Sequence, residues 1–89
     1  MNIKFGKKFV KQYSKAPQKI KKAFSDRLEI FKKQPFHPLL NNHSLKGKYL
    51  SCQSINVTCD WRVIYSEEFE NKMKVVIFLA LGTHSQLYK

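Results

Sequence analysis

Three histidines carry the acid–base chemistry that this sequence could perform. His37 stands between two prolines in QPFHPLL, His43 belongs to NNHSLKGKY, and His84 belongs to GTHSQLY. An imidazole with its ordinary pKa of about 6.5 can take up or release a proton near neutral pH, so two of them could divide the work of base and acid. The flanking prolines favour a structural role for His37, whereas His43 and His84 fall at the ends of elements, where a rigid scaffold presents side chains to a ligand. For either residue alone, a histidine that only caps a loop is the simpler interpretation.

Charged side chains recur two residues apart near these histidines. Asp60 and Arg62 flank Trp61 in TCDWRVIY, so a strand that includes Asp60 places both charges on one face. Lys46 and Lys48 have the same spacing in LKGKY. A guanidinium offers a cationic fork suited to phosphate, and lysines add mobile point charges. Together they could hold an RNA backbone and stabilise charge that develops on phosphorus. The alternative is a surface ion pair between Asp60 and Arg62.

The first half of the chain predicts a short strand and two helices that would support these side chains. NIKF, at residues 2–5, alternates apolar and polar positions as a strand does. Apolar residues three to four apart predict a helix over residues 6–14 and a second helix from Pro17 to about Gln34. Pro17 suits the first turn of a helix, and Pro35 ends the second one. The lysines outside the apolar stripes form either a solvated face or a binding surface.

The second half predicts a β-hairpin followed by a buried strand. YLSCQSINV and DWRVIYSEE are rich in β-branched and aromatic residues. Alternate positions of this hairpin share one apolar face: Ile55, Val57, Trp61, Val63 and Tyr65. After the polar turn EEFENK, the run MKVVIFLALG is apolar almost throughout, as expected of a strand buried on both faces, and Gly82 lets the chain leave the sheet. The predicted fold class is α+β: an N-terminal strand, two helices, and three further strands of a mainly antiparallel sheet with the helices on one face.

Length and charge narrow the possible functions. Eighty-nine residues predict one domain, residues 1–89, and 17 Lys and Arg against 6 Asp and Glu give a net charge of +11. Such a charge calls for a polyanionic partner, which could be nucleic acid, an anionic membrane surface or an acidic protein. No apolar run approaches the roughly 18–20 residues that span a bilayer, and the N-terminal segment lacks the apolar core of a signal peptide, which predicts a cytoplasmic protein. Two cysteines without a histidine at ligand spacing make a weak zinc site, so no metal or cofactor is expected.

The segments NNHSLKGKY, SINVTCDWRVIY and FLALGTHSQLY follow two basic helices in that order. In this the chain resembles the RelE/ParE superfamily of bacterial toxins, and in particular its YafQ-like branch, over nearly its whole length. The resemblance implies the RelE-like microbial RNase fold and a type II toxin, an endoribonuclease or mRNA interferase that enters the ribosomal A site and cuts mRNA during translation. Members of this branch cleave without a metal, by attack of the ribose 2′-hydroxyl on the adjacent phosphate. A cognate acidic antitoxin is expected to inactivate the toxin in a hetero-oligomer, and the free toxin is expected to be a monomer with no membrane partner.

Carried over position by position, the resemblance implies a catalytic set and a binding set. The catalytic set is His43, Asp60 and His84, with His84 as general acid. The residues expected to hold RNA or the transition state are Lys46, Lys48, Asn56, Trp61, Arg62 and Tyr88. One position departs from the branch, because its prototype has a further histidine where this sequence has Asn56. An amide can donate a hydrogen bond but cannot shuttle a proton, so Asn56 either positions substrate or leaves a smaller catalytic set.

Two rival functions fit parts of the same pattern. A ParE-like toxin shares the superfamily fold but poisons DNA gyrase without catalysis, and its members generally lack the paired histidine motifs. A basic nucleic-acid-binding module without catalysis would account for the +11 charge, and its binding would fall steeply with salt. It would leave the placement of the histidines unexplained. The sequence therefore favours the endoribonuclease, while the division between base and acid, the codon preference and the identity of the antitoxin stay open.

Overall fold

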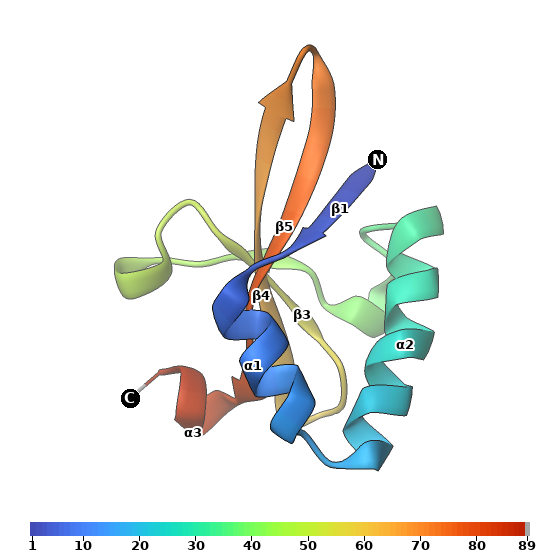
Figure 1. Ribbon diagram of the computed structural model, residues 1–89, viewed down its shortest axis with the longest axis vertical. Coiled ribbons are helices and arrows are strands. Elements are labelled where there is room, and N and C mark those ends of the chain that lie inside the picture. The colour runs from blue at the N-terminus through green and yellow to red at the C-terminus, as the bar shows by residue number, and fades with distance from the viewer. Residues whose placement is uncertain (89) are drawn as a thin grey trace.

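The computed structural model describes residues 1–88 as a mixed five-stranded sheet with two helices on one face and a short third helix at its end (Figure 1). In chain order the elements are β1 (Asn2–Phe5), α1 (Lys7–Lys15), α2 (Gln18–Lys33), the 3-10 turn η1 (Pro38–Leu40), β2 (His43–Ser44), the 3-10 turn η2 (Gly47–Tyr49), β3 (Gln53–Asn56), β4 (Trp61–Glu70), β5 (Met73–Thr83) and α3 (His84–Leu87). The strand order is β1-β5-β4-β3-β2, and only the β1–β5 pair is parallel among the pairs described. The predicted α+β class is confirmed. The sheet gains β2, whose two residues are too few for an alternating pattern to indicate a strand.

The main core lies between the sheet and the α1–α2 pair. The apolar face predicted for the first hairpin is confirmed: its buried members are Ile55, Val57, Val63 and Tyr65, and Trp61 packs against them. Phe78 of β5 lies at the centre, in ring contact with Phe5, Phe9, Phe24, Phe31 and Tyr65. Such aromatic contacts add to the stabilisation from area burial. Because β5 is the second strand of the sheet and is packed on both faces, most of its apolar run is buried as predicted, and it supports the residues that follow it.

The β4–β5 hairpin is longer than predicted. The polar turn expected over six residues is wrong, because β4 extends to Glu70 and only Asn71 and Lys72 separate the strands. Both have positive φ, 51° and 68°, which suits the two-residue turns that match the twist of a hairpin. Three glutamates among residues 67–70 concealed the strand, since the side chains of this part of β4 are all exposed and the hairpin tip projects past the rest of the sheet (Figure 1). None of the helices in residues 1–88 is long and apolar enough to cross a membrane.

Candidate functional site

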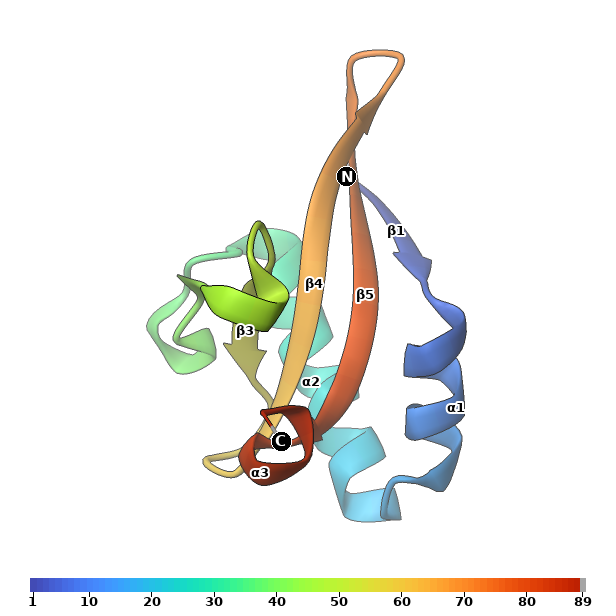
Figure 2. The same ribbon diagram turned by 90° about the vertical axis from the view of Figure 1, so that its left-hand side faces the viewer.

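Two segments cover the face of the sheet opposite α1 and α2. Figure 2 looks onto this face, with α3 in front of the lower ends of β4 and β5, the yellow-green η2 turn in front of β3, and α2 behind the sheet. A small second core joins the two segments to the sheet: Ile64, Ala80 and Leu87 are buried, with Leu45, Tyr49 and Cys52 packed against them. The segments that carry the lysine pair and His84 are therefore fixed on one face.

The pairing register places several predicted site residues on this same face. Residues directly opposite one another in antiparallel strands point to the same side. One row across the sheet consists of His43, Ser54, Ile64 and Ala80. The next row towards α3 consists of Asn56, Arg62 and Gly82. His43 and Arg62 therefore lie in neighbouring rows of one surface, although they are 19 positions apart in the sequence.

The local structure before β2 determines which nitrogen of His43 is available. Its Nδ1 lies 2.8 Å from the carbonyl oxygen of Asn41, and because a carbonyl only accepts, Nδ1 donates. In the neutral ring the lone pair is then on Nε2, and the side chain is exposed. Asn42 anchors the segment through Nδ2, which donates to the carbonyl of Pro35 at 2.9 Å and to the hydroxyl of Tyr65 at 2.7 Å. His43 thus presents an acceptor nitrogen from a fixed backbone.

His84 begins α3, a helix that the sequence did not indicate because it has only four residues. A reciprocal capping box holds its start: Thr83 Oγ1 accepts from the Gln86 amide at 3.2 Å, and Gln86 Oε1 accepts from the Thr83 amide at 2.9 Å. The His84 amide donates to the carbonyl of Asp60 at 3.1 Å, which joins α3 to the turn before β4. The His84 and Tyr88 rings lie 4.7 Å apart at 39°. The two predicted residues of the C-terminal motif therefore lie in direct ring contact.

Tyr88 also connects α3 to the other side of the face. Burial raises the pKa of Tyr88, and the nearby positive charge of Arg62 opposes this shift. The Tyr49 ring meets Tyr88 edge-on at 5.7 Å, while the Tyr49 hydroxyl donates to the Leu87 carbonyl at 3.0 Å. The buried Ser54 hydroxyl lies close enough to lower the pKa of Tyr88 slightly, but it is too poorly aligned to form a hydrogen bond within residues 1–88.

Arg62 is held from the β3 side. Its Nε donates to Asn56 Oδ1 at 3.3 Å, and its Nη2 donates to the carbonyl of Cys59 at 3.4 Å. The alternative of an ion pair with Asp60 is wrong, since no such pair forms in the described part of the chain. The Asp60 side chain is exposed, and the hydrogen bond between Asp60 and His84 joins their backbones.

The remaining predicted residues divide between the two faces. Lys46 precedes η2 and Lys48 lies within it. Both are exposed, and Lys48 Nζ lies 5.4 Å from the centre of the Tyr49 ring. Trp61 instead packs on the side of the main core, so the structure does not bring it onto the face of Arg62. The structural role expected for His37 is confirmed, because its Nδ1 accepts the amide of the residue two positions on and caps η1.

Sequence reasoning missed Tyr49, whose contacts join α3 to the lysine segment across 38 positions of sequence. A lone tyrosine that follows two lysines gives no signal for such a contact. Beside Tyr49, this face carries an acceptor nitrogen on His43, the His84–Tyr88 pair, the fixed guanidinium of Arg62 and two exposed lysines, Lys46 and Lys48. These groups suit displacement at phosphorus, which needs a base, an acid and cations. Residues 1–88 contain no group of three or more His, Cys, Asp or Glu side chains placed to hold a metal ion.

Comparisons with known proteins place these features in context. The family described as bacterial toxin of type II toxin-antitoxin system, YafQ, matches residues 1–89. A YoeB/ParE toxin from Agrobacterium tumefaciens has a similar structure, with a TM-score of 0.75 and 17% identity over 94% of this chain and 99% of that one. YafQ from Escherichia coli gives 0.74 and 22% over 99% and 98%, and the E. coli DinJ-YafQ complex gives 0.68 and 22% over the same shares. These likenesses show the fold, and no curated protein sequence matches the chain.

Proposed function

Because the chain belongs to the YafQ family of bacterial toxins of type II toxin-antitoxin systems, we propose that it is an endoribonuclease that cleaves mRNA on translating ribosomes. The observation that best supports this proposal is the gathering of His43, Arg62 and the His84–Tyr88 pair on one face. A net charge of +11 favours binding to RNA. The proposed action of the toxin on ribosomes would take place in the cytoplasm.

In the proposed reaction, His43 Nε2 accepts the proton of a ribose 2′-hydroxyl as the 2′-oxygen attacks the adjacent phosphorus. The bond from phosphorus to the 5′-oxygen breaks, and His84 gives that oxygen its proton. The immediate products are a 2′,3′-cyclic phosphate and a 5′-hydroxyl end. Arg62 stabilises the charge on the phosphoryl oxygens, helped by Lys46 and Lys48. Asp60 is the acidic member of the set, and no metal takes part.

Mapping of mRNA ends tests the proposal directly. Purified toxin is added to translating ribosomes, and we expect new 5′-hydroxyl ends within the translated region, which a polynucleotide kinase can label without prior phosphatase treatment. The same mRNA without ribosomes should remain largely intact. If induction of the toxin arrests cell growth while the mRNA stays intact, the proposal is contradicted. In that case, inhibition of DNA gyrase supercoiling by the purified toxin would support the ParE-like function.

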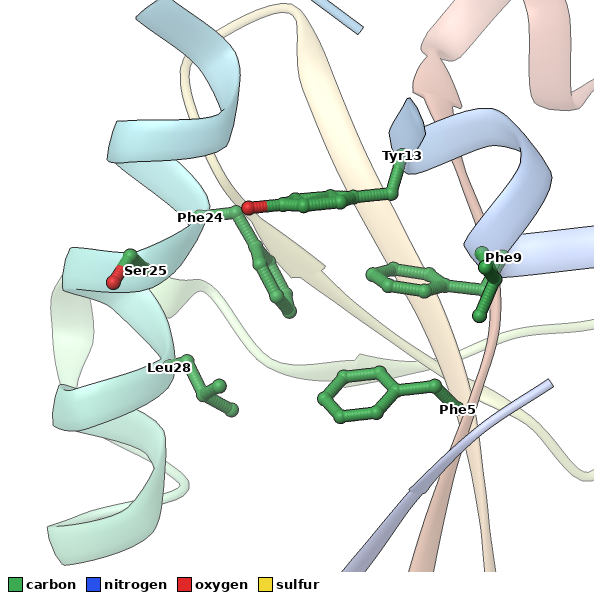
Figure 3. A pocket seen from close by; sticks show the side chains of 7 residues that line it. Phe5, Phe9, Tyr13, Phe24, Ser25 and Leu28 are labelled. Carbon is green, nitrogen blue, oxygen red and sulfur yellow. The ribbon is translucent and has the colours of Figure 1, made fainter. Parts of the chain in front are cut away.

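An antitoxin is the second proposed partner, as in the DinJ-YafQ complex of E. coli. On the helix side, away from the proposed active face, an open apolar cavity of about 320 Å³ lies between β1, α1 and α2. Figure 3 shows Phe5, Phe9 and Phe24 around it. Lysines are frequent on both helices, with Lys21 Nζ 5.7 Å from the ring centre of Tyr13 at the cavity. We infer that an amphipathic acidic segment of the antitoxin binds here. Its apolar residues would fill the cavity, and its carboxylates would form ion pairs with the lysines.

The substitution Val10→Glu tests this antitoxin-binding site. Val10 lines the cavity and is 54% exposed, so a carboxylate there is tolerated by the free toxin but must lose water when the antitoxin binds. We expect antitoxin affinity to fall by at least about tenfold, or about 1.4 kcal/mol, in calorimetric titration, with the rate of mRNA cleavage unchanged. Gln18→Glu, at the exposed start of α2, adds the same charge outside the cavity lining and is the matched control. Equal antitoxin affinities for the two variants would exclude the cavity as the antitoxin-binding site.

A further inference from the structure

Asn56 and Arg62 form a cross-strand pair at the end of the first hairpin. They lie directly opposite one another in β3 and β4, with side chains on the same face, and Asn56 Oδ1 accepts from Arg62 Nε at 3.3 Å. The Cys59 carbonyl, in the turn between the strands, accepts from Arg62 Nη2 at 3.4 Å. Both contacts use the edge of the guanidinium that carries Nε and Nη2. One short hairpin therefore holds this arginine from two points.

We propose that Asn56 is a positioning residue that fixes the Arg62 guanidinium, so that its free edge can bind the phosphate of the RNA. This inference rests on the proposed function. A guanidinium has five N–H donors in a rigid fork, and the two contacts use two of them. The edge formed by Nη1 and Nη2 keeps the pair of donors that matches two phosphate oxygens. Asn56 thus acts through Arg62 and not as a replacement for a proton-transferring histidine.

The neutral amide of Asn56 can hold Arg62 without reducing the positive charge that is available to bind phosphate. An aspartate at position 56 would also accept from Arg62 Nε, but its negative charge would compete with the phosphate for the guanidinium. A leucine would leave Arg62 with the Cys59 carbonyl alone, and a long arginine side chain held at one point samples more rotamers. A neutral acceptor fixes the fork and leaves its full positive charge for the phosphate. Position 56 is half-buried, so the interaction is only partly screened by water.

The pKa of Tyr88 gives a second indication that Arg62 lies near the proposed site. The positive charge of Arg62 acts on the Tyr88 hydroxyl and counters part of the effect of burial on the pKa of Tyr88. Tyr88 is itself in ring contact with His84. The guanidinium that Asn56 holds therefore lies within electrostatic reach of Tyr88, next to the short helix α3 that carries His84.

The test combines a double-mutant cycle with a measurement on the arginine itself. Asn56→Leu should lower kcat for ribosome-bound mRNA about tenfold while KM changes less, because loosening Arg62 weakens stabilisation of the transition state. In an Arg62→Gln background the same substitution should have little further effect. Asn56→Asp should keep Arg62 fixed but raise KM, since the added charge weakens RNA binding. Thermal unfolding of each variant checks that it remains folded.

Proton exchange at Arg62 Nε, followed by ¹⁵N NMR, reports on the positioning without any cleavage. We expect slow exchange in the wild type and in Asn56→Asp, and exchange at least several-fold faster in Asn56→Leu. Unchanged exchange in Asn56→Leu, or an equal loss of kcat with and without Arg62, would overturn the proposal. If the wild type cleaves no mRNA, the proposed function fails, while the exchange rates still decide whether Asn56 holds Arg62.

Discussion

His84→Ala and His43→Ala are each expected to lower mRNA cleavage on ribosomes by about 10²–10⁴-fold, the usual contribution of a positioned acid or base. His84 lies at the start of α3 with its ring against Tyr88, and His43 presents Nε2 because Nδ1 donates to the Asn41 carbonyl. Both side chains are exposed, so neither substitution removes core packing. The measurements are the single-turnover rate of mRNA cleavage and growth after induction.

His37→Ala is the matched control for these two variants. Its imidazole caps η1 by accepting the Leu39 amide at 3.1 Å, and its loss should cost about 1 kcal/mol of stability, as for other caps. Cleavage should stay at the wild-type rate. The double variant His43→Ala, His84→Ala should lose less than the product of the single losses, because residues that act as a unit are not additive. If both single variants arrest growth as strongly as the wild type, the assignment of the site is wrong.

The dependence of cleavage on pH separates the two histidines. If His43 acts as base and His84 as acid, the wild-type rate should rise and then fall as pH increases, because one imidazole must be neutral and the other protonated. His43→Ala should remove the dependence on the acidic side, and His84→Ala the dependence on the basic side. An exchange of these two effects would reverse the roles without changing the residues involved.

Period-two patterning predicted much of the fold because it reflects local geometry. Val63 and Tyr65 were assigned to the core face from alternation alone, and the same rule placed Arg62 on the opposite face. Alternation failed for residues 67–70, where all the side chains of β4 meet water and no apolar period exists. It also gave no sign of α3, which depends on the capping box and on contacts with distant residues.

The face on which the candidate residues lie was easier to predict than the contacts between them. His43 and His84 were chosen from their places at the ends of elements, and the structure brings both onto the face where Arg62 lies. The partner of Arg62 was not predictable from the i, i+2 spacing, which suggested Asp60, because the cross-strand register with Asn56 decides it. Tyr49 could not be found at all, since its contacts cross 38 positions of sequence.

Gly82 has a different role from the one that its position at the end of an apolar run suggested. It lies within β5, which continues to Thr83, so it does not release the chain from the sheet. A Cβ built on Gly82 would lie 3.0 Å from Gln86 Oε1 and 3.4 Å from both Gln86 Cβ and Leu87 Cδ2. The missing side chain therefore lets α3 fold back onto the strand, and the position of His84 and Tyr88 depends on it.

Gly82→Val is accordingly expected to lower mRNA cleavage about 10²-fold, the usual effect of displacing reacting groups by about 1 Å. The added methyl groups would push α3 from the face, while the main core on the other side keeps its packing, so thermal unfolding should remain cooperative. Gly82→Ala should have a smaller effect, because its Cβ meets mainly the flexible end of Gln86. Measured in a Gln86→Ala background, Gly82→Ala should then add little, whereas Gly82→Val should still be damaging because the contact with Leu87 remains. Wild-type cleavage by Gly82→Val would mean that catalysis does not require α3 in this position, and His84 would then lose its place in the proposed mechanism.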